Sequence, residues 1–256
     1  NVPEELTSDR DVILCGLQQD WEAITYASKE LQADEEVAIA ALAQSVMALK
    51  VIPEALWTRP VVRAAMLAAA RRDPEPLKFC PEVIRGEADV MLEALKVQPK
   101  FASDLPAKLL EEKKFVLSAV QGNWQVLEHL PSQYTKDREV VSAAVAQSPF
   151  SLRLAGMDLR GDRELVLECV RQSSGALRYA ATELLGDAEV VLAAVRQDVQ
   201  CLRQASETLR NDKELMLEAV RLGGIALQFA SPALQDDREV VLAAVEQSGH
   251  ALEFAS

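Results

Sequence analysis

Hydrophobic residues recur along this chain at the spacing of one helical face, and short polar turns separate the hydrophobic runs. From Asp187, the sequence Asp-Ala-Glu-Val-Val-Leu-Ala-Ala-Val is followed by a turn and then by a shorter run between Cys201 and Ser206. The first run predicts a long helix, helix A, which begins after Asp187 and ends near Gln197. The second run predicts a shorter antiparallel helix, helix B.

This two-part pattern begins ten times, and the beginnings are evenly spaced. Consecutive copies start 25 residues apart, except for one step of 28 residues where the stretch 71–76 carries three extra residues. A fixed period of about 20 to 50 residues is typical of a solenoid, and helices shorter than about 12 to 15 residues need such stacking to be stable. We therefore expect an all-α fold, a right-handed α-solenoid of ~25-residue repeats with two helices each. The copies begin at Asp9, Asp34, Arg59, Glu87, Glu112, Asp137, Asp162, Asp187, Asp212 and Asp237.

The repeats predict one continuous domain over 1–256, because each unit of such an array packs only on its neighbours. Within it we expect irregular repeats over 57–106 and regular repeats over 137–256. Asn1 aligns with Phe229, in the middle of a repeat, and Ser256 falls where a following repeat would begin. We therefore expect the chain to be a fragment of a longer protein.

The acidic residues that begin most copies have two interpretations. Stacked carboxylates could form a ladder that binds cations, but an aspartate before a helix is also a good N-cap. Capping accounts for every one of them, so we favour it. A second row, of glutamines in the last turn of helix A, is expected to serve helix ends or to form hydrogen bonds between repeats. It consists of Gln19, Gln44, Gln147, Gln172, Gln197 and Gln247.

The net charge of −13 disfavours nucleic acid and anionic lipid as partners, because both are bound mainly by lysine and arginine. An RNA-binding array would need a basic residue repeated at one position of the repeat, and we expect no such stripe. No apolar run reaches the ~18 to 20 residues of a membrane span. These features predict a soluble protein without a transmembrane segment, for which direct lipid binding is not expected.

The four cysteines and two histidines suggest no cofactor, metal or catalytic site. Cys15, Cys80, Cys169 and Cys201 occur where other copies have alanine, so we expect them to be small core residues. They fit a reducing compartment, either the cytoplasm or the interior of an organelle. His129 and His250 are five repeats apart, which excludes a shared metal or nucleophile site.

Three tryptophans are the candidate partner-binding residues. Trp21 and Trp124 occupy the same position of the repeat, at the turn between helices A and B, where later copies need only serine or glycine. Tryptophan is enriched at interface hot spots, although both rings could instead cover a neighbouring repeat. Trp57 begins the irregular stretch 57–106, which holds the insertion, and insertions in solenoids often lie on the binding face.

The sequence from Asp237 to Ser256, which reads Asp-Arg-Glu-Val-Val-Leu-Ala-Ala-Val-Glu-Gln-Ser-Gly-His-Ala-Leu-Glu-Phe-Ala-Ser, resembles the helical repeat known as domain of unknown function 4116. The resemblance covers essentially the whole chain. It is weaker from Asp34 to Glu112, where Arg59 and Pro60 replace the acidic cap. It implies a helical-repeat scaffold but no activity, and so it supplies no functional residues.

Together these features favour a non-enzymatic scaffold for protein–protein interaction, as a peripheral subunit or adaptor of a larger assembly. One alternative is the target-recognition region of a longer enzyme or effector. An RNA-binding array and a purely structural spacer are further alternatives.

Overall fold

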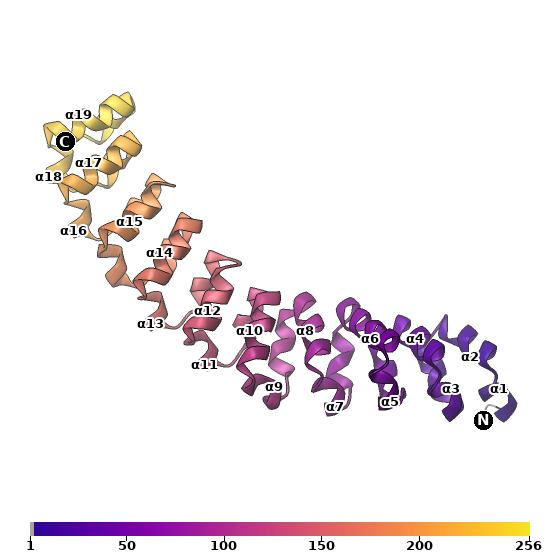
Figure 1. Cartoon of the computed structure of the whole chain (residues 1–256). Coiled ribbons are helices and arrows are strands. Elements are labelled where there is room, and N and C mark those ends of the chain that lie inside the picture. The colour runs from indigo at the N-terminus through magenta and orange to yellow at the C-terminus, as the bar shows by residue number, and fades with distance from the viewer. Residues whose placement is uncertain (1–2) are drawn as a thin grey trace. The chain divides into compact units, whose positions relative to one another are not determined.

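The structure is a computed structural model that describes residues 3–256, and every element in this range is helical (Figure 1). The chain divides into two compact units, and each is described by itself. The first unit ends at Leu130 and the second begins at Pro131. The predicted placement of Asn1 within a repeat lies outside the described residues. The all-helical prediction is confirmed.

Helix A of each predicted repeat is present as an α-helix of eight to thirteen residues. In the first unit these helices are α2 (Arg10–Leu17), α4 (Glu35–Gln44), α6 (Pro60–Arg72), α8 (Ala88–Val97) and α10 (Lys113–Gly122). In the second unit they are α12 (Arg138–Val145), α14 (Arg163–Gln172), α15 (Ala188–Val195), α17 (Lys213–Leu222) and α19 (Arg238–Gln247).

Helix B is present in every repeat, but as a 3₁₀ helix rather than an α-helix. In the first unit these helices are η1 (Trp21–Tyr26), η2 (Val46–Lys50), η3 (Glu75–Phe79), η4 (Pro99–Asp104) and η5 (Trp124–His129). In the second unit they are η6 (Pro149–Leu154), η7 (Ser174–Tyr179), η9 (Val199–Gln204), η10 (Gly224–Phe229) and η11 (Gly249–Phe254).

A third helical turn, which the two-helix prediction missed, connects each 3₁₀ helix to the next helix A. It is a single turn of four or five residues with one buried leucine, isoleucine or aromatic side chain in most repeats. In the first unit these turns are α1 (Glu4–Thr7), α3 (Lys29–Gln32), α5 (Glu54–Trp57), α7 (Glu82–Arg85) and α9 (Ala107–Glu111). In the second unit they are α11 (Ser132–Thr135), α13 (Met157–Arg160), η8 (Thr182–Gly186), α16 (Glu207–Arg210) and α18 (Pro232–Gln235).

The 3₁₀ conformation follows from which residues of helix B are buried. In η7 the adjacent third and fourth residues, Ala176 and Leu177, are fully buried, whereas the fifth residue, Arg178, is exposed. With three residues per turn, the second and fifth residues lie on one edge and the adjacent pair faces the core. The geometry therefore creates one exposed edge on every repeat, which contributes the candidate surface described below.

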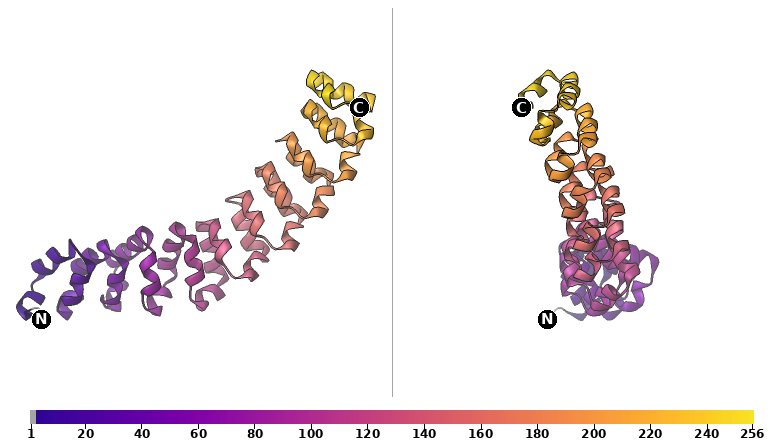
Figure 2. Two further views of the ribbon diagram at one scale, coloured as in Figure 1. Left: turned by 180° about the vertical axis from the view of Figure 1, so that it is seen from behind. Right: turned by 90° about the vertical axis from the view of Figure 1, so that its left-hand side faces the viewer.

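Within each unit, most consecutive helices A contact one another in sequence order, and so do most consecutive 3₁₀ helices (Figure 2). Small residues allow a close approach. In α4, α12, α15 and α19 the second of two consecutive alanines is fully buried, and these residues are Ala41, Ala144, Ala194 and Ala244. At Gly224 the approach is closest, since an added Cβ would lie 2.4 Å from the carbonyl oxygen of Ala244.

Backbone hydrogen bonds also connect consecutive repeats, and proline removes them from part of the chain. The N–H of Ser206 donates to the carbonyl of Leu185 at 2.9 Å, and the equivalent bonds of Ser28, Gly156, Ala181, Ser231 and Ser256 measure 2.7–3.1 Å. The equivalent residues in the four repeats between Ser28 and Gly156 are Pro53, Pro81, Pro106 and Pro131, which have no N–H to donate.

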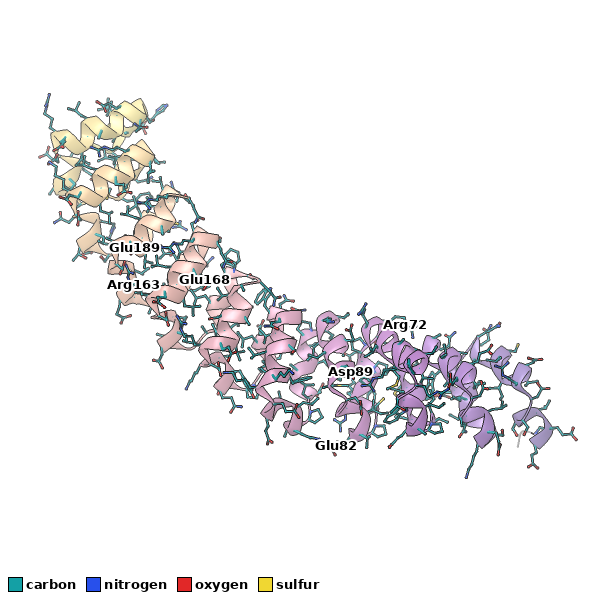
Figure 3. The ribbon with its side chains drawn as sticks, in the orientation of Figure 1. Arg72, Glu82, Asp89, Arg163, Glu168 and Glu189 are labelled. Carbon is teal, nitrogen blue, oxygen red and sulfur yellow. The ribbon has the colours of Figure 1, made fainter. Side chains whose placement is uncertain are left out.

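The predicted insertion lengthens a helix rather than a loop. Helix α6 has thirteen residues where α4 has ten, which accommodates the three extra residues. The added turn is tied to the preceding repeat, because Arg72 (Figure 3) donates from Nη2 to the carbonyl of Leu42 at 3.1 Å.

The cysteine prediction is correct at three positions and wrong at one. Cys80, Cys169 and Cys201 are buried, whereas Cys15 is exposed. Cys15 aligns with Ala193 on the half-exposed side of helix A rather than with the fully buried Ala194, which explains the difference.

Candidate binding surface on the 3₁₀ helices

The exposed edge of the 3₁₀ helices is the surface on which apolar and cationic side chains gather. In the second unit its second positions include Phe150 and Ile225, which are 43% and 44% exposed. We call this edge the 3₁₀ surface. In the second unit it comprises Phe150, Arg153, Gly175, Arg178, Gln200, Arg203, Ile225, Gln228, His250 and Glu253.

Hollows lie between consecutive 3₁₀ helices at equivalent places. Between η7 and η9 a hollow of about 470 Å³ is lined by Gly175, Arg178, Gln200 and Arg203, among others. A hollow of about 360 Å³ lies between η10 and η11, and one of about 270 Å³ lies between η4 and η5 in the first unit. The recurrence follows from the repeat, because equivalent helices leave equivalent gaps.

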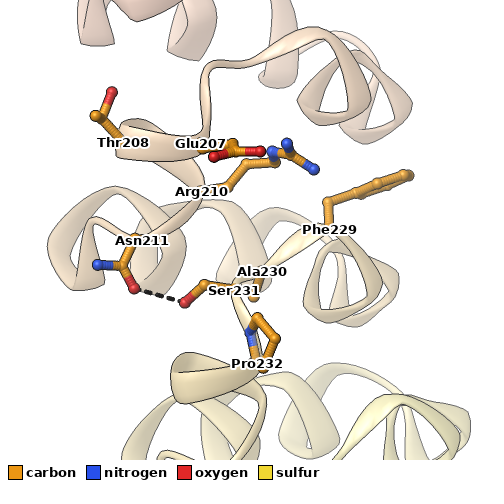
Figure 4. A pocket seen from close by; sticks show the side chains of 8 residues that line it. All are labelled: Glu207, Thr208, Arg210, Asn211, Phe229, Ala230, Ser231 and Pro232. Carbon is orange, nitrogen blue, oxygen red and sulfur yellow. Dashed lines mark hydrogen bonds between the residues drawn. The ribbon is translucent and has the colours of Figure 1, made fainter.

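Another hollow, of about 560 Å³, lies beside the third helical turn (Figure 4). Glu207 and Arg210 of α16 line one side, and Phe229 at the end of η10 lines the other. Ser231 donates from Oγ to Oδ1 of Asn211 at 2.6 Å across it. This hollow therefore combines an aromatic side chain with groups of both charges.

Contrary to the sequence prediction, a basic residue does recur at one position of the repeat. It is the fifth residue of the 3₁₀ helix, or the fourth in η3, and it is exposed in each case. Two of these cations lie over the next aromatic ring: Arg178 is 5.4 Å from the ring centre of Tyr179, and Lys78 is 5.2 Å from that of Phe79. The residues are Lys50, Lys78, Arg153, Arg178 and Arg203. Aligning the copies position by position would have revealed the row.

The three candidate tryptophans do not share one environment. Trp21 and Trp124 begin η1 and η5 and are half-buried at the edge of the 3₁₀ helices. Trp57 ends α5 and is only 6% exposed, so its ring offers almost no surface to a partner. Trp57 is therefore removed from the candidates, because the turn that it ends packs it into the core.

The aspartates that begin helix A are N-caps, as predicted, whereas Glu87 and Glu112 at the equivalent position make no side-chain cap hydrogen bond. The carboxylate of Asp187 accepts from the N–H of Val190 at 3.1 Å, and six equivalent aspartates make the same kind of bond. Their other oxygen has a second role. Oδ2 of Asp187 accepts from Nε of Arg163 in the preceding repeat at 2.7 Å.

The same inter-repeat ion pair recurs along both units. Arg163 also contacts Glu189 at 2.6 Å (Figure 3), and hydrogen bonds from Arg163 hold the pKa of Asp187 below its usual value. Equivalent pairs join Arg10 to Asp34 and Glu36, Arg138 to Asp162 and Glu164, and Lys213 to Asp237 and Glu239. The carboxylates are thus neutralised by the preceding repeat. In residues 3–256 no group of three or more His, Cys, Asp or Glu is placed to hold a metal ion.

The glutamine row forms hydrogen bonds between repeats, as predicted for Gln197 and Gln44. Gln197 donates to the carbonyls of Val170 and Arg171 at 2.8 and 3.1 Å, and accepts from the N–H of Ser174 at 2.9 Å. Gln44 donates to the carbonyl of Gln18 at 3.5 Å. These amides serve the end of the preceding helix A.

Two of the buried cysteines are poorly activated as nucleophiles. Burial raises the pKa of the Cys80 thiol to about 11 and that of Cys169 to about 12. Such thiols carry little thiolate at neutral pH. His250 is exposed on η11, 3.9 Å from Glu253, and His129 ends η5 in the other unit.

A family model matches the chain in five segments, of which the first two overlap. The family is described as Domain of unknown function (DUF4116), and the segments are 1–32, 9–57, 112–160, 162–210 and 212–256. The chain belongs to this family. The stretch without a match, 58–111, contains α6 with its extra turn and two of the prolines that replace a hydrogen-bond donor. No curated protein and no solved structure matched the chain.

The helices of this family member are also short. Among those that residues 3–256 form, none combines the length and the hydropathy that a bilayer crossing requires.

Proposed function

We propose that the chain is a right-handed α-solenoid that serves as a non-enzymatic scaffold for protein–protein interaction. In this proposal it acts as a peripheral subunit or adaptor of a larger assembly, and its partner binds along the 3₁₀ surface. The observation that carries the proposal is the recurrence of hollows between consecutive 3₁₀ helices. The sequential contacts of the helices A support the solenoid.

The composition of the 3₁₀ surface supports a protein partner. Exposed apolar side chains next to arginines are typical of the centre of protein interfaces, which are enriched in aromatic residues and arginine. Trp21 and Trp124 add half-buried indoles at the same edge in the first unit. Each repeat contributes only a small contact, so affinity would come from several repeats acting together.

Crosslinking mass spectrometry on the protein from its native source tests the proposal. We expect one stoichiometric partner, crosslinked through residues next to the 3₁₀ helices. Crosslinks only within the chain would instead indicate a structural spacer. A catalytic domain on the same polypeptide, with the partner as its substrate, would indicate the target-recognition alternative.

Variants then locate the surface. Replacing Phe150 and Ile225 with serine should abolish crosslinking to the partner. Replacing Leu222 and Leu242, each 46% exposed on helices A, should leave it bound. The reverse result would place the interface on the helices A.

A further inference from the structure

Three arginines form a row on consecutive repeats of the second unit. Arg153, Arg178 and Arg203 are the fifth residues of η6, η7 and η9, and all three are exposed. They lie on a chain whose net charge is −13, so the row has the opposite sign to the molecule as a whole. We call it the basic row.

Two of these charges, on Arg178 and Arg203, are not used in ion pairs within residues 3–256. The guanidinium of Arg178 lies over the ring of Tyr179. Both guanidinium groups border the hollow of about 470 Å³ between η7 and η9. Asp198 also lines this hollow, but its carboxylate caps η9 by accepting from the N–H of Gln200 at 2.9 Å.

We propose that the basic row binds an acidic, extended polypeptide segment of the partner. This inference rests on the proposed function and specifies the chemistry of its ligand. Consecutive packed helices are about 8 to 10 Å apart. A polyproline II segment rises about 3.1 Å per residue with three residues per turn, so every third side chain lies on one face at about 9 Å intervals. Carboxylates at every third residue therefore match the arginines.

Neighbouring groups favour a polypeptide over a nucleic acid. Phe150 and Ile225 border the row with apolar surface, and the guanidinium of Arg178 is already stacked on an aromatic ring. The affinity of a protein for a nucleic acid depends on many contacts between phosphates and cationic side chains. Beyond the three arginines, the phosphates of a nucleic acid would meet a protein that is acidic as a whole. A short acidic segment needs only the row itself.

A triple variant and a matched control test the proposal. Glutamine is native at the same position in η10, as Gln228, so the fold accepts it there. The control removes three arginines that lie at the ends of helices A and have the same repeat spacing. Two of them, Arg171 and Arg196, make exposed ion pairs that contribute little to the stability of the fold. The two proteins have the same net charge. They are Arg153→Gln/Arg178→Gln/Arg203→Gln and Arg171→Gln/Arg196→Gln/Arg221→Gln.

The probes are fluorescent peptides of about a dozen residues with glutamates at every second, third or fourth position, and the same peptides with glutamine. We expect the every-third-residue peptide to bind best. We also expect binding to weaken at least about tenfold in the first variant and to remain within about twofold in the control. Equal weakening in both variants, no dependence on glutamate, or no binding by any acidic peptide would overturn the proposal.

Two further outcomes separate this inference from the proposed function. If oligouridine binds more tightly than every peptide and loses affinity in the first variant, the row recognises nucleic acid and the proposal fails. If the native partner still crosslinks to the first triple variant, the scaffold function stands but its partner does not use the basic row.

Discussion

Arg63 in α6 donates from Nε to Asp89 in α8 at 2.7 Å, and thereby restores an ion pair that its repeat lacks at the usual place. The repeat begins with Arg59 and Pro60, so no cation follows the cap as Arg163 follows Asp162. Arg63 lies one turn further along the helix and still reaches Glu87, at 2.8 Å, as well as Asp89. The inter-repeat ion pair is thus present even where the sequence pattern is degraded.

Replacing Arg63 with glutamine should lower the free energy of unfolding by roughly 0.5–1 kcal/mol, because Arg63 is only 26% exposed and joins two carboxylates. Urea denaturation measures the change. The control is Arg59→Gln, which removes a pair with Glu35 from an arginine that is 61% exposed, and should have a smaller effect. Equal effects would mean that the second carboxylate adds nothing.

The stability of the protein should decrease in acid because several aspartates both cap helix A and form an ion pair with the preceding repeat. The pKa of Asp187 is lowered first by its hydrogen bond with Arg163, and that of Asp162 by Arg138. A carboxyl group whose folded pKa is lowered stabilises the fold above its unfolded pKa of about 3.9, and this contribution is lost as the pH falls through the folded pKa. The melting temperature should therefore fall below about pH 5.

Asp187→Asn provides the control for this pH dependence. Asparagine keeps the cap but has no proton to gain, so the variant should be less stable than the parent at pH 7 and should lose less on acidification. An unchanged slope between melting temperature and pH would show that other groups dominate the acid transition.

Gly224 and Gly249 begin equivalent 3₁₀ helices but should respond oppositely to alanine. At Gly224 the new Cβ would lie 2.4 Å from the carbonyl oxygen of Ala244, whereas at Gly249 nothing lies within 4 Å. Gly224→Ala should cost about 1–3 kcal/mol because it forces η10 and α19 apart. Gly249→Ala should be neutral or stabilise by up to about 1 kcal/mol. Thermal denaturation of both variants measures the two changes in stability. Equal changes would contradict the close approach at Gly224.

Arg160→Gln should stabilise the protein by about 0.5–1.5 kcal/mol. The Nε of Arg160 is buried and has no hydrogen-bond partner within residues 3–256. Gln235, at the equivalent position, donates to the carbonyls of Leu227 and Gln228 at 3.1 and 3.3 Å. The glutamine should reach the equivalent carbonyls at the end of η6. Gln235→Ala is the companion variant and should be destabilising; a loss of stability in Arg160→Gln would contradict this role of the amide.

Amide hydrogen exchange should differ between turns with and without the inter-repeat backbone bond. Exchange in α16, which follows the bond from Ser206 to Leu185, should be slower than in α7, which follows Pro81. Each lost bond removes about 1 kcal/mol that opposes local opening, so roughly a fivefold difference in exchange is expected. Amides of α8 and α17 serve as the slow reference. Equal exchange in α7 and α16 would show that side-chain packing alone holds these turns.

The sequence predicted the helices A well because two signals coincided at each of them. Asp187 marked where a helix begins, and the spacing of Val190, Val191 and Ala194 marked which face is buried. The position of helix B was predicted but its 3₁₀ conformation was not. A run of six residues in which two adjacent residues are buried does not distinguish an α-helix from a 3₁₀ helix. The third turn was missed because a single buried leucine, such as Leu209, carries no periodicity.

The candidate surface was harder to foresee. The net charge suggested an evenly acidic exterior, but charge is distributed by position, and the fifth residue of the 3₁₀ helix is basic only in some repeats. Gln228 and Glu253 interrupt the row in the last two copies. Trp57 was a candidate because it begins the stretch that holds the insertion, but it ends the compact turn α5, which starts after Pro53 and buries the ring.

The fixed register of the inter-repeat contacts restricts how this protein can change length. Arg163 reaches 24 residues forward to Asp187 and 26 residues forward to Glu189. The equivalent pairs of Arg138 and Lys213 have the same separations. Duplication or loss of a whole repeat leaves each of these partners in place, whereas gain or loss of a single residue displaces the partners on either side of it. Recombination between repeats in the gene would therefore yield folded descendants in steps of one repeat. Smaller insertions survive only where, as in α6, a helix takes up the added residues.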